Sequence, residues 1–257
     1  MKFNNLYFLR SRIKLLISSI IDLIIINIIF FIATNVFGEL MYDLFAMHYP
    51  KNSTFFLWQP LSHMFMHGDL THILFNMFGL WMFGTPLEQM WGKQKFIFFY
   101  LSAGFGAVLI QTLVYHYDVL VVTQSLIDNG LTKIDINSFF ETGRLNNSLI
   151  QTIGEEKLAS GIQSYKAVMV GASGALYGIL VGFAMLFPNV QLMLLFPPIP
   201  IKAKYLVPLL ILFDLFFGFT SYSVGPIAHF AHIGGAITGF IMMWYWKRNQ
   251  FNNKRWN

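Results

Sequence analysis

The chain has 257 residues, of which 56% are hydrophobic and only 11% are charged. This composition excludes an ordinary water-soluble domain, which would have too little polar surface to cover itself. From this composition we expect a polytopic membrane protein, and its net charge of +5 is modest. The absence of cysteine excludes disulfides, thiol nucleophiles and thiolate metal sites.

Six apolar segments are long enough to cross a bilayer, which needs about 20 helical residues. They predict an all-α membrane protein, a bundle of six transmembrane helices over residues 20–38, 69–87, 95–115, 171–187, 205–221 and 228–246. The aromatic, proline-interrupted segment between the first two is expected to lie along the membrane interface. Residues 116–167 lose the apolar continuity and gain polar side chains, which predicts an extended outer loop insert in water.

Basic residues near the segment ends predict the orientation of the bundle. Twelve of the 17 Lys and Arg fall on one face if the segments alternate: Lys2, Arg10, Arg12, Lys14, Lys93, Lys95, Lys202, Lys204, Lys247, Arg248, Lys254 and Arg255. The positive-inside rule makes that face cytoplasmic. We therefore expect both termini inside a cell membrane, most simply a bacterial inner membrane. The first segment is too long for a signal peptide and lacks a cleavage pattern, so we expect an uncleaved span.

This orientation divides the chain into parts. They are a cytoplasmic basic N-terminus (1–19), a membrane domain (20–115 and 168–246), an extracytoplasmic polar insert (116–167) and a cytoplasmic basic tail (247–257).

Polar side chains within the apolar segments gather in the second, fourth and sixth. His72 and Asn76 are spaced i to i+4, so they share one helix face, while Ser173 and His232 lie in the fourth and sixth. If the segments alternate, all four lie toward the outer ends of their helices. Hydrogen-bonding groups at membrane depth are candidates for function.

Small residues at intervals of four predict close packing of the fourth and sixth helices. Gly174, Gly178 and Gly182 form one such row, and Ala231, Gly235 and Gly239 form the other. These rows let helix backbones approach closely in lipid. We expect this contact to bring the Ser173 hydroxyl to the His232 imidazole, with Tyr177 packed on the ring.

A serine and a histidine in contact can act as nucleophile and general base. Candidate donors for an oxyanion are the Asn76 amide, the His72 ring and the backbone N–H of Ser173. Asp22 lies near the start of the first segment, and Asp214 lies in the middle of the fifth without an apparent partner. We therefore expect a Ser-His dyad rather than a triad.

Three motifs together resemble the rhomboid intramembrane serine proteases: His72-Ile-Leu-Phe-Asn76, Gly171-Ala-Ser173-Gly174 followed by Tyr177, and Ala231-His232-Ile-Gly234-Gly235. The resemblance implies Ser173 as nucleophile, His232 as base, and His72, Asn76 and the Ser173 amide as the oxyanion site. It also implies transmembrane protein substrates and no cofactor. By the same analogy, a substrate enters near the fifth segment and the loop from Ser221 to Ile227 covers the site. Many family members carry a Trp-Arg pair where this chain has Trp58-Gln59.

Other readings stay open or are disfavoured. A catalytically inactive relative that binds membrane helices is the main alternative, although such proteins typically lose the serine or the histidine. A transporter predicts an inverted repeat, which is not evident. His63, His67 and His72 lack an acidic or thiolate ligand nearby, so we expect no metal. We expect the lipid bilayer as a partner and no nucleic acid; the oligomeric state and the purpose of the insert are left open.

Overall fold

A computed structural model describes residues 18–193, 198–220 and 227–249. The basic residues at positions 2–14, most of the predicted tail and the predicted covering loop at 221–226 lie outside these residues. The fold below is that of the described part of the chain.

The first half of the chain forms helices over the first three predicted segments. They are α2 (Ser19–Phe37), a continuous helix made of α5 (Leu70–Gly79), the π-helical turn η2 (Leu80–Gly84) and α6 (Thr85–Trp91), and α7 (Lys93–Asp128). Between α2 and α5 lie α3 (Glu39–Phe45), strand β1 (Met47–His48), α4 (Gln59–Ser62) and the 3₁₀ turn η1 (His63–Phe65). Asp69 starts α5 as an N-cap, because its side chain accepts the backbone N–H of His72.

The second half adds helices over the remaining three segments, namely α11 (Ser173–Leu186), α12 (Ala203–Phe219) and α13 (His229–Asn249). Strands β3 (Gln191–Met193) and β4 (Pro200–Lys202) form a hairpin between α11 and α12. Strand β2 (Val168–Met169) pairs antiparallel with β1, with Met47 opposite Met169. This pairing ties the segment after α2 to the loop that leads into α11.

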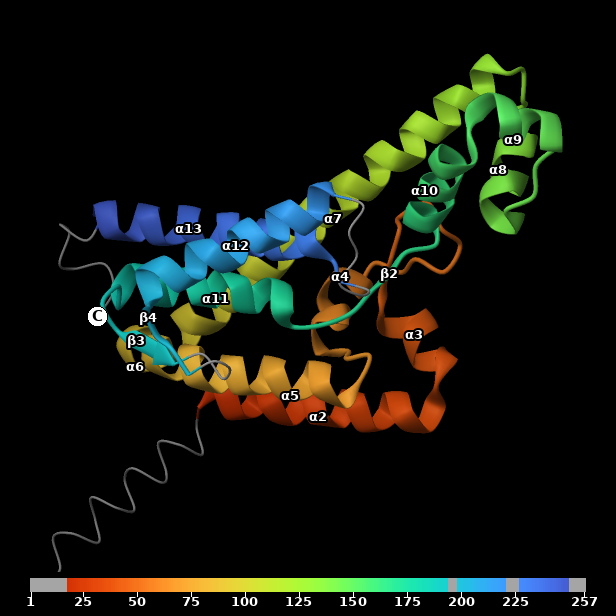
Figure 1. Ribbon diagram of the computed structural model, residues 1–257. Coiled ribbons are helices and arrows are strands. Elements are labelled where there is room, and N and C mark those ends of the chain that lie inside the picture. The colour runs from red at the N-terminus through yellow and green to blue at the C-terminus, as the bar shows by residue number, and fades with distance from the viewer. Residues whose placement is uncertain (1–17, 194–197, 221–226, 250–257) are drawn as a thin grey trace, which may run out of the picture.

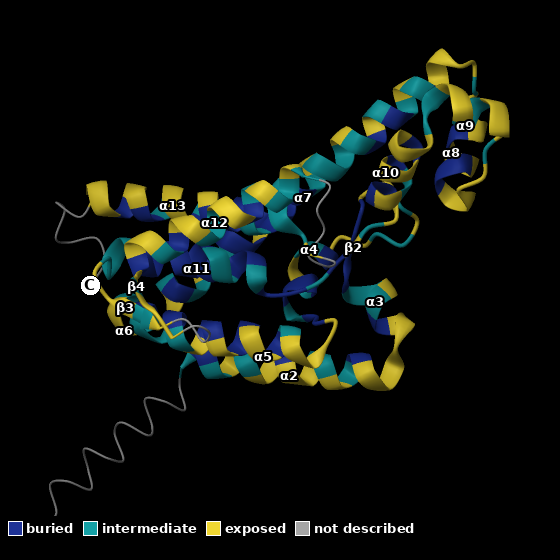
Figure 2. Cartoon of the chain, viewed as in Figure 1, coloured by how far each residue is buried: buried dark blue, intermediate teal, exposed yellow. Residues whose placement is uncertain are grey.

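The helices pack into a bundle whose outer faces are apolar. Helix α13 packs along α7 and α11, and α2 lies beside α5 on the opposite side of the bundle (Figure 1). Buried residues lie on the helix faces toward the middle of the bundle, and exposed residues lie on the outer faces (Figure 2). Many of the outward side chains are large and apolar, such as Ile29, Leu113 and Phe216, each more than half exposed. Such a surface suits lipid and would be a liability in water.

Helices occupy all six predicted segments within the described residues. By length and composition, α2 and α7 could each cross a membrane, and α11 is a shorter apolar helix. The count of six membrane-spanning helices therefore stays a prediction.

Helix α7 is longer than its apolar segment, because the predicted boundary at residue 115 falls inside it and the helix continues to Asp128. Val119, Val122 and Leu126 bury one face of this extension at helical spacing, although polar residues between them interrupt the apolar run. Residues 116–128 are thus part of α7.

Three further helices form a small subdomain on the far end of α7 (Figure 1). They are α8 (Lys133–Thr142), α9 (Asn147–Ile153) and α10 (Glu155–Tyr165). Phe139, Phe140 and Leu158 pack with the α7 extension in a core separate from that of the bundle. Burial raises the pKa of Tyr165 to about 12, and its hydroxyl lies 2.9 Å from a carboxylate oxygen of Glu141.

Candidate active site

Ser173 is the first residue of α11, at the end of a tight loop. Gly171 in this loop has φ +123°, a conformation that side chains rarely adopt. A Cβ there would lie 2.8 Å from His72 Nε2 and 3.7 Å from Ser173 Oγ. The Gly171 N–H donates to the carbonyl of His63 at 2.9 Å, which fixes the loop against η1. Glycine at position 171 therefore leaves room for the His72 ring beside the serine.

The Ser173 hydroxyl oxygen lies 2.8 Å from Nε2 of His232, which is on the first turn of α13. The predicted packing of small residues brings these side chains together. A Cβ on Gly235 would lie 1.8 Å from the carbonyl oxygen of Gly174, and one on Gly239 would lie 2.7 Å from Cα of Gly178. The helices are therefore in backbone contact just below the serine and the histidine.

Tyr177 lies one turn along α11 from Ser173, and its ring stacks on the His232 imidazole. The ring centroids are 4.2 Å apart and the planes differ by 9°. This contact was predicted from the spacing, and it restricts rotation of the imidazole out of the plane that faces Ser173.

Asp214 has partners in the structure, although the sequence predicted no partner for it and no role toward His232. Its Oδ1 lies 3.0 Å from Nδ1 of His232 and 2.6 Å from Nδ1 of His229. A side-chain hydrogen bond also links it to Tyr177. The geometry is that of a Ser-His-Asp chain rather than an isolated dyad.

One signal in the sequence could have identified Asp214. It lies in the last third of α12, so in an alternating bundle it shares the outer depth of Ser173 and His232. The predicted fifth segment, residues 205–221, continues past the end of the helix at Phe219, and Asp214 is therefore central in the segment but not in the helix.

The two other predicted oxyanion donors lie on α5, one turn apart. The His72 ring and the Ser173 hydroxyl both lie beside Gly171, where an added Cβ would be within 4 Å of each. Asn76 is buried, and its amide donates to the backbone carbonyl of His72 at 3.0 Å. The first N–H groups of a helix have no partner within that helix, which places the Ser173 N–H among the available donors.

Gln59, in place of the family arginine, is fully buried and organises the segment between α2 and α5. Its amide nitrogen donates to the carbonyls of Asp43 and Thr54, both at 2.9 Å. Trp58 donates its indole N–H to the carbonyl of Leu44 at 2.7 Å. The glutamine thus ties this segment together without a charged side chain.

The three histidines near α5 make separate contacts. His63 Nδ1 lies 3.1 Å from the carbonyl of Gln59, and the rings of His67 and His72 meet edge to face at 4.9 Å. Across the described part of the chain, no group of three His, Cys, Asp or Glu side chains is arranged to hold a metal ion.

Comparison with known proteins identifies the site region. The profile of the Rhomboid domain matches residues 54–132 and 139–249, which include all of the site residues above. Relatives include "RHOMBOID-like protein 6, mitochondrial" of Arabidopsis thaliana, 25% identical over 72% of this chain and 42% of that protein. "Rhomboid protein 1, mitochondrial" of Saccharomyces cerevisiae is 26% identical over 70% of this chain and 39% of its own length.

A bacterial relative matches a shorter region at higher identity. "Rhomboid protease GlpG" of Serratia proteamaculans is 37% identical over 31% of this chain and 29% of that protein. Each of these three matches spans less than half of the relative's own length.

Proposed function

The chain belongs to the rhomboid family, and from this premise we propose that it is an intramembrane serine endopeptidase. The observation that carries the proposal is the 2.8 Å contact between Ser173 Oγ and His232 Nε2. A hydroxyl is a weak nucleophile until a neighbouring base accepts its proton, and an imidazole can do so near neutral pH. Bacterial relatives named as rhomboid proteases support the same reaction.

In the proposed reaction, Ser173 donates its hydroxyl proton to His232 across this contact. Ser173 Oγ attacks the carbonyl carbon of a peptide bond while His232 Nε2 takes the hydroxyl proton. His232 then gives that proton to the leaving amine as the C–N bond breaks, which leaves an ester on Ser173. A water molecule, deprotonated by His232, attacks the ester, and its proton returns to Ser173 as the acid product leaves.

The negative oxygen formed during attack needs donors around it. We assign this role to the Ser173 backbone N–H, the His72 ring and the Asn76 amide. Removing one such donor typically lowers kcat by about 10²–10³-fold. The start of α11 adds the positive end of its helix dipole.

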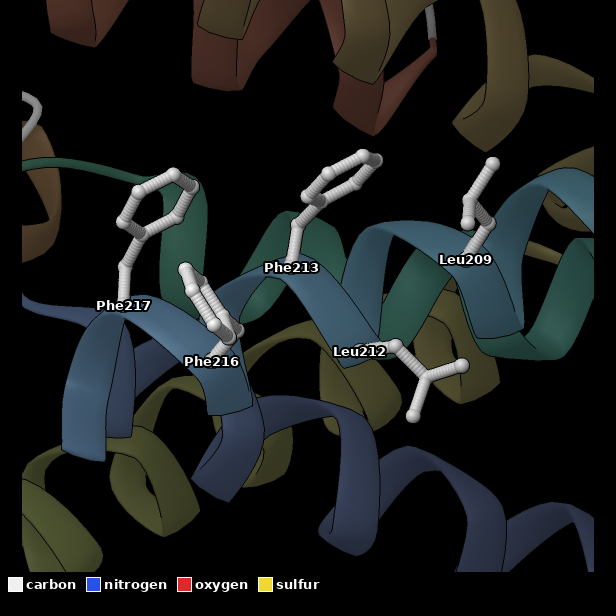
Figure 3. A pocket seen from close by; sticks show the side chains of 5 residues that line it. All are labelled: Leu209, Leu212, Phe213, Phe216 and Phe217. Atoms are coloured by element: carbon white, nitrogen blue, oxygen red, sulfur yellow. The ribbon is translucent and has the colours of Figure 1, made fainter. Parts of the chain in front are cut away.

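The substrates that we propose are membrane-spanning protein segments that enter the bundle laterally beside α12. This helix carries an open pocket of about 330 Å³, lined by Leu209, Leu212, Phe213, Phe216 and Phe217 (Figure 3). An apolar helix is the kind of chain that such side chains accept. A crosslink from α12 to α5 should therefore reduce cleavage of membrane-spanning substrates more than cleavage of short soluble peptides; equal loss of both would contradict lateral entry.

The protein is a membrane protein, and its orientation is part of the proposal. The start of α2, the β3–β4 hairpin and the end of α13 lie at one end of the bundle, and the α8–α10 subdomain lies at the other (Figure 1). We propose that the first end is cytoplasmic. The relatives include mitochondrial and bacterial proteins, so the expectation of a bacterial inner membrane is not supported over a mitochondrial one.

The test is cleavage of a fluorescent membrane-spanning substrate by the purified protein in liposomes. We expect cleavage that falls by about 10⁴-fold or more in Ser173→Ala and in His232→Ala, with unfolding temperatures retained. Ser160→Ala, a serine on the exposed face of α10, is the matched control and should keep full activity. Cleavage that persists in Ser173→Ala would refute the assignment, and a folded but inactive wild type would favour a helix-binding relative.

A further inference from the structure

The carboxylate of Asp214 is buried at the junction of three helices. The residue is only 5% exposed, although it lies in an apolar helix. A carboxylate at such depth is costly unless hydrogen bonds and charges compensate it. The groups that face it are His229 and His232 from α13 and Tyr177 from α11. All three are titratable, and each offers a hydrogen to the carboxylate.

The hydrogen bonds at Asp214 determine which nitrogen of His232 carries the proton. An ionised carboxylate only accepts, so Nδ1 of His232 must be the donor. In a neutral imidazole the other nitrogen then has a free lone pair, and this nitrogen, Nε2, is the one 2.8 Å from Ser173 Oγ. The contact with Asp214 thus selects the tautomer that can accept the serine proton; this assignment comes from the network of partners.

His229 makes the same kind of contact one helical turn before His232. Both Nδ1 atoms approach the same oxygen, Oδ1, at 2.6 and 3.0 Å. Residues three apart share a helix face, so α13 presents two donors to one carboxylate. His229 therefore adds a second hydrogen bond from α13 that holds Asp214 in place.

We propose that Asp214 is a positioning residue for the reaction, which fixes the His232 tautomer and stabilises the imidazolium formed during attack, and that His229 anchors the carboxylate. This inference rests on the proposed protease function. It extends the Ser-His pair to a chain of three side chains from α11, α13 and α12.

The test measures kcat, KM and the pH profile of cleavage for Asp214→Asn, Asp214→Glu and His229→Ala. For Asp214→Asn we expect kcat to fall by about 100-fold or more with little change in KM, because an amide can favour the wrong tautomer and carries no charge. The acidic limb of its profile should move to lower pH, since the protonated imidazole loses its counter-charge. Asp214→Glu should recover part of kcat, and His229→Ala should lose less than Asp214→Asn.

Asp22→Asn is the matched control, because it removes an aspartate from α2 that is paired with Lys93 far along the chain. It should leave kcat and the pH profile unchanged. Wild-type kcat and an unshifted profile in Asp214→Asn would overturn the inference. A second outcome would also overturn it: kcat falls equally in Asp214→Asn and Asp214→Glu, the fall parallels a fall in unfolding temperature, and the acidic limb does not move. That outcome would indicate a structural role alone. Failure of the protease proposal itself is distinct, because cleavage would then survive Ser173→Ala.

Discussion

Three side chains surround the imidazole of His232, and each restricts it differently. Ser173 lies at Nε2, Asp214 lies at Nδ1, and Tyr177 stacks on the ring face. The two hydrogen bonds fix the ring edge, and the stacking fixes the ring plane. In the reaction that we propose, His232 would therefore be held in place before a substrate arrives, which reduces the reorganisation needed during attack.

Substitution of Tyr177 separates the contribution of its ring from that of its hydroxyl. Tyr177→Ala removes the surface on which the imidazole stacks, so we expect kcat to fall by about 10–100-fold, in the range of a misplaced catalytic group. Tyr177→Phe keeps the ring and loses only the hydrogen bond to Asp214, so it should stay much nearer to wild type. Cleavage assays in liposomes measure both, and equal activity of the two variants would contradict the stacking role.

Short-range spacing predicted some of these contacts, and others depend on the fold. The rows of small residues predicted the meeting of Ser173 and His232, and the position of Tyr177 predicted that its ring packs on the imidazole. Spacing could not predict the partners of Asp214, because they come from α11 and α13. Which residues Asp214 meets depends on how α12 is oriented about its own axis, and the sequence pattern does not give this orientation. The contacts of Gln59 were not predictable either, since the two carbonyls that accept from its amide lie in α3 and in the loop before α4.

At the scale of elements, the site depends on how closely α11 and α13 approach. Glycine at positions 174, 178, 235 and 239 allows backbone contact. Helix α7 completes this packing, because Gly234 faces the carbonyl of Gly106 and Gly178 faces Ala103. Association in lipid relies on such van der Waals contact, so added side-chain volume acts directly on the geometry.

Gly235→Ala should separate the two helices and disrupt the site. Its new Cβ would lie 1.8 Å from a backbone oxygen that cannot rotate away. We expect unfolding free energy to fall by about 2–3 kcal/mol, at the upper end for overpacking, and cleavage to fall with it. Thermal unfolding in detergent measures the first quantity. Gly68→Ala is the control, since the nearest atom to its new Cβ is 3.9 Å away; equal losses in both variants would contradict this packing.

The subdomain on the end of α7 has its own core, which the hydropathy pattern did not predict. The buried positions of α7 beyond residue 115 keep helical spacing, but polar residues at 123–125 and the flanking Asp118 and Asp128 lower the local hydropathy. The sequence therefore indicated a polar insert without indicating how it folds or where the preceding helix ends.

Gly161→Val tests whether this subdomain acts on the chemistry. A Cβ at position 161 would lie 2.5 Å from Val122, so the larger side chain should loosen α10 from α7 by about 1–3 kcal/mol. We expect faster proteolysis within residues 133–165 and cleavage of a short soluble peptide within about twofold of wild type, because no site residue comes from this part. Ser160→Ala is the neighbouring control. A parallel loss of peptide cleavage would instead make the subdomain part of the active site.

At the scale of the whole molecule, the two ends of the bundle differ in chemistry. Lys93, Lys202, Lys247 and Arg248 lie at the end that carries the start of α7, the β3–β4 hairpin and the end of α13. The opposite end carries the α8–α10 subdomain and the loop into Ser173. In the orientation that we propose, this basic end is cytoplasmic, as the positive-inside rule favours, and the site lies near the outer surface.

The absence of cysteine makes this orientation directly measurable, since any introduced thiol is unique. A membrane-impermeant maleimide should label Lys157→Cys on intact cells or right-side-out vesicles, and should label Asn249→Cys only after permeabilisation. Both positions are exposed, so access to solvent does not limit the reaction. Labelling of both thiols from the same side would contradict the alternating topology.

The most direct measurement is the mass of the protein after reaction with a fluorophosphonate, which traps an activated serine without requiring a known substrate. A single phosphonyl adduct should form and map to Ser173, and its rate of formation should fall by about 10²–10⁴-fold in His232→Ala, as for loss of a general base. An adduct on another residue, or an undiminished rate in His232→Ala, would contradict the claim that this hydroxyl and this imidazole act together.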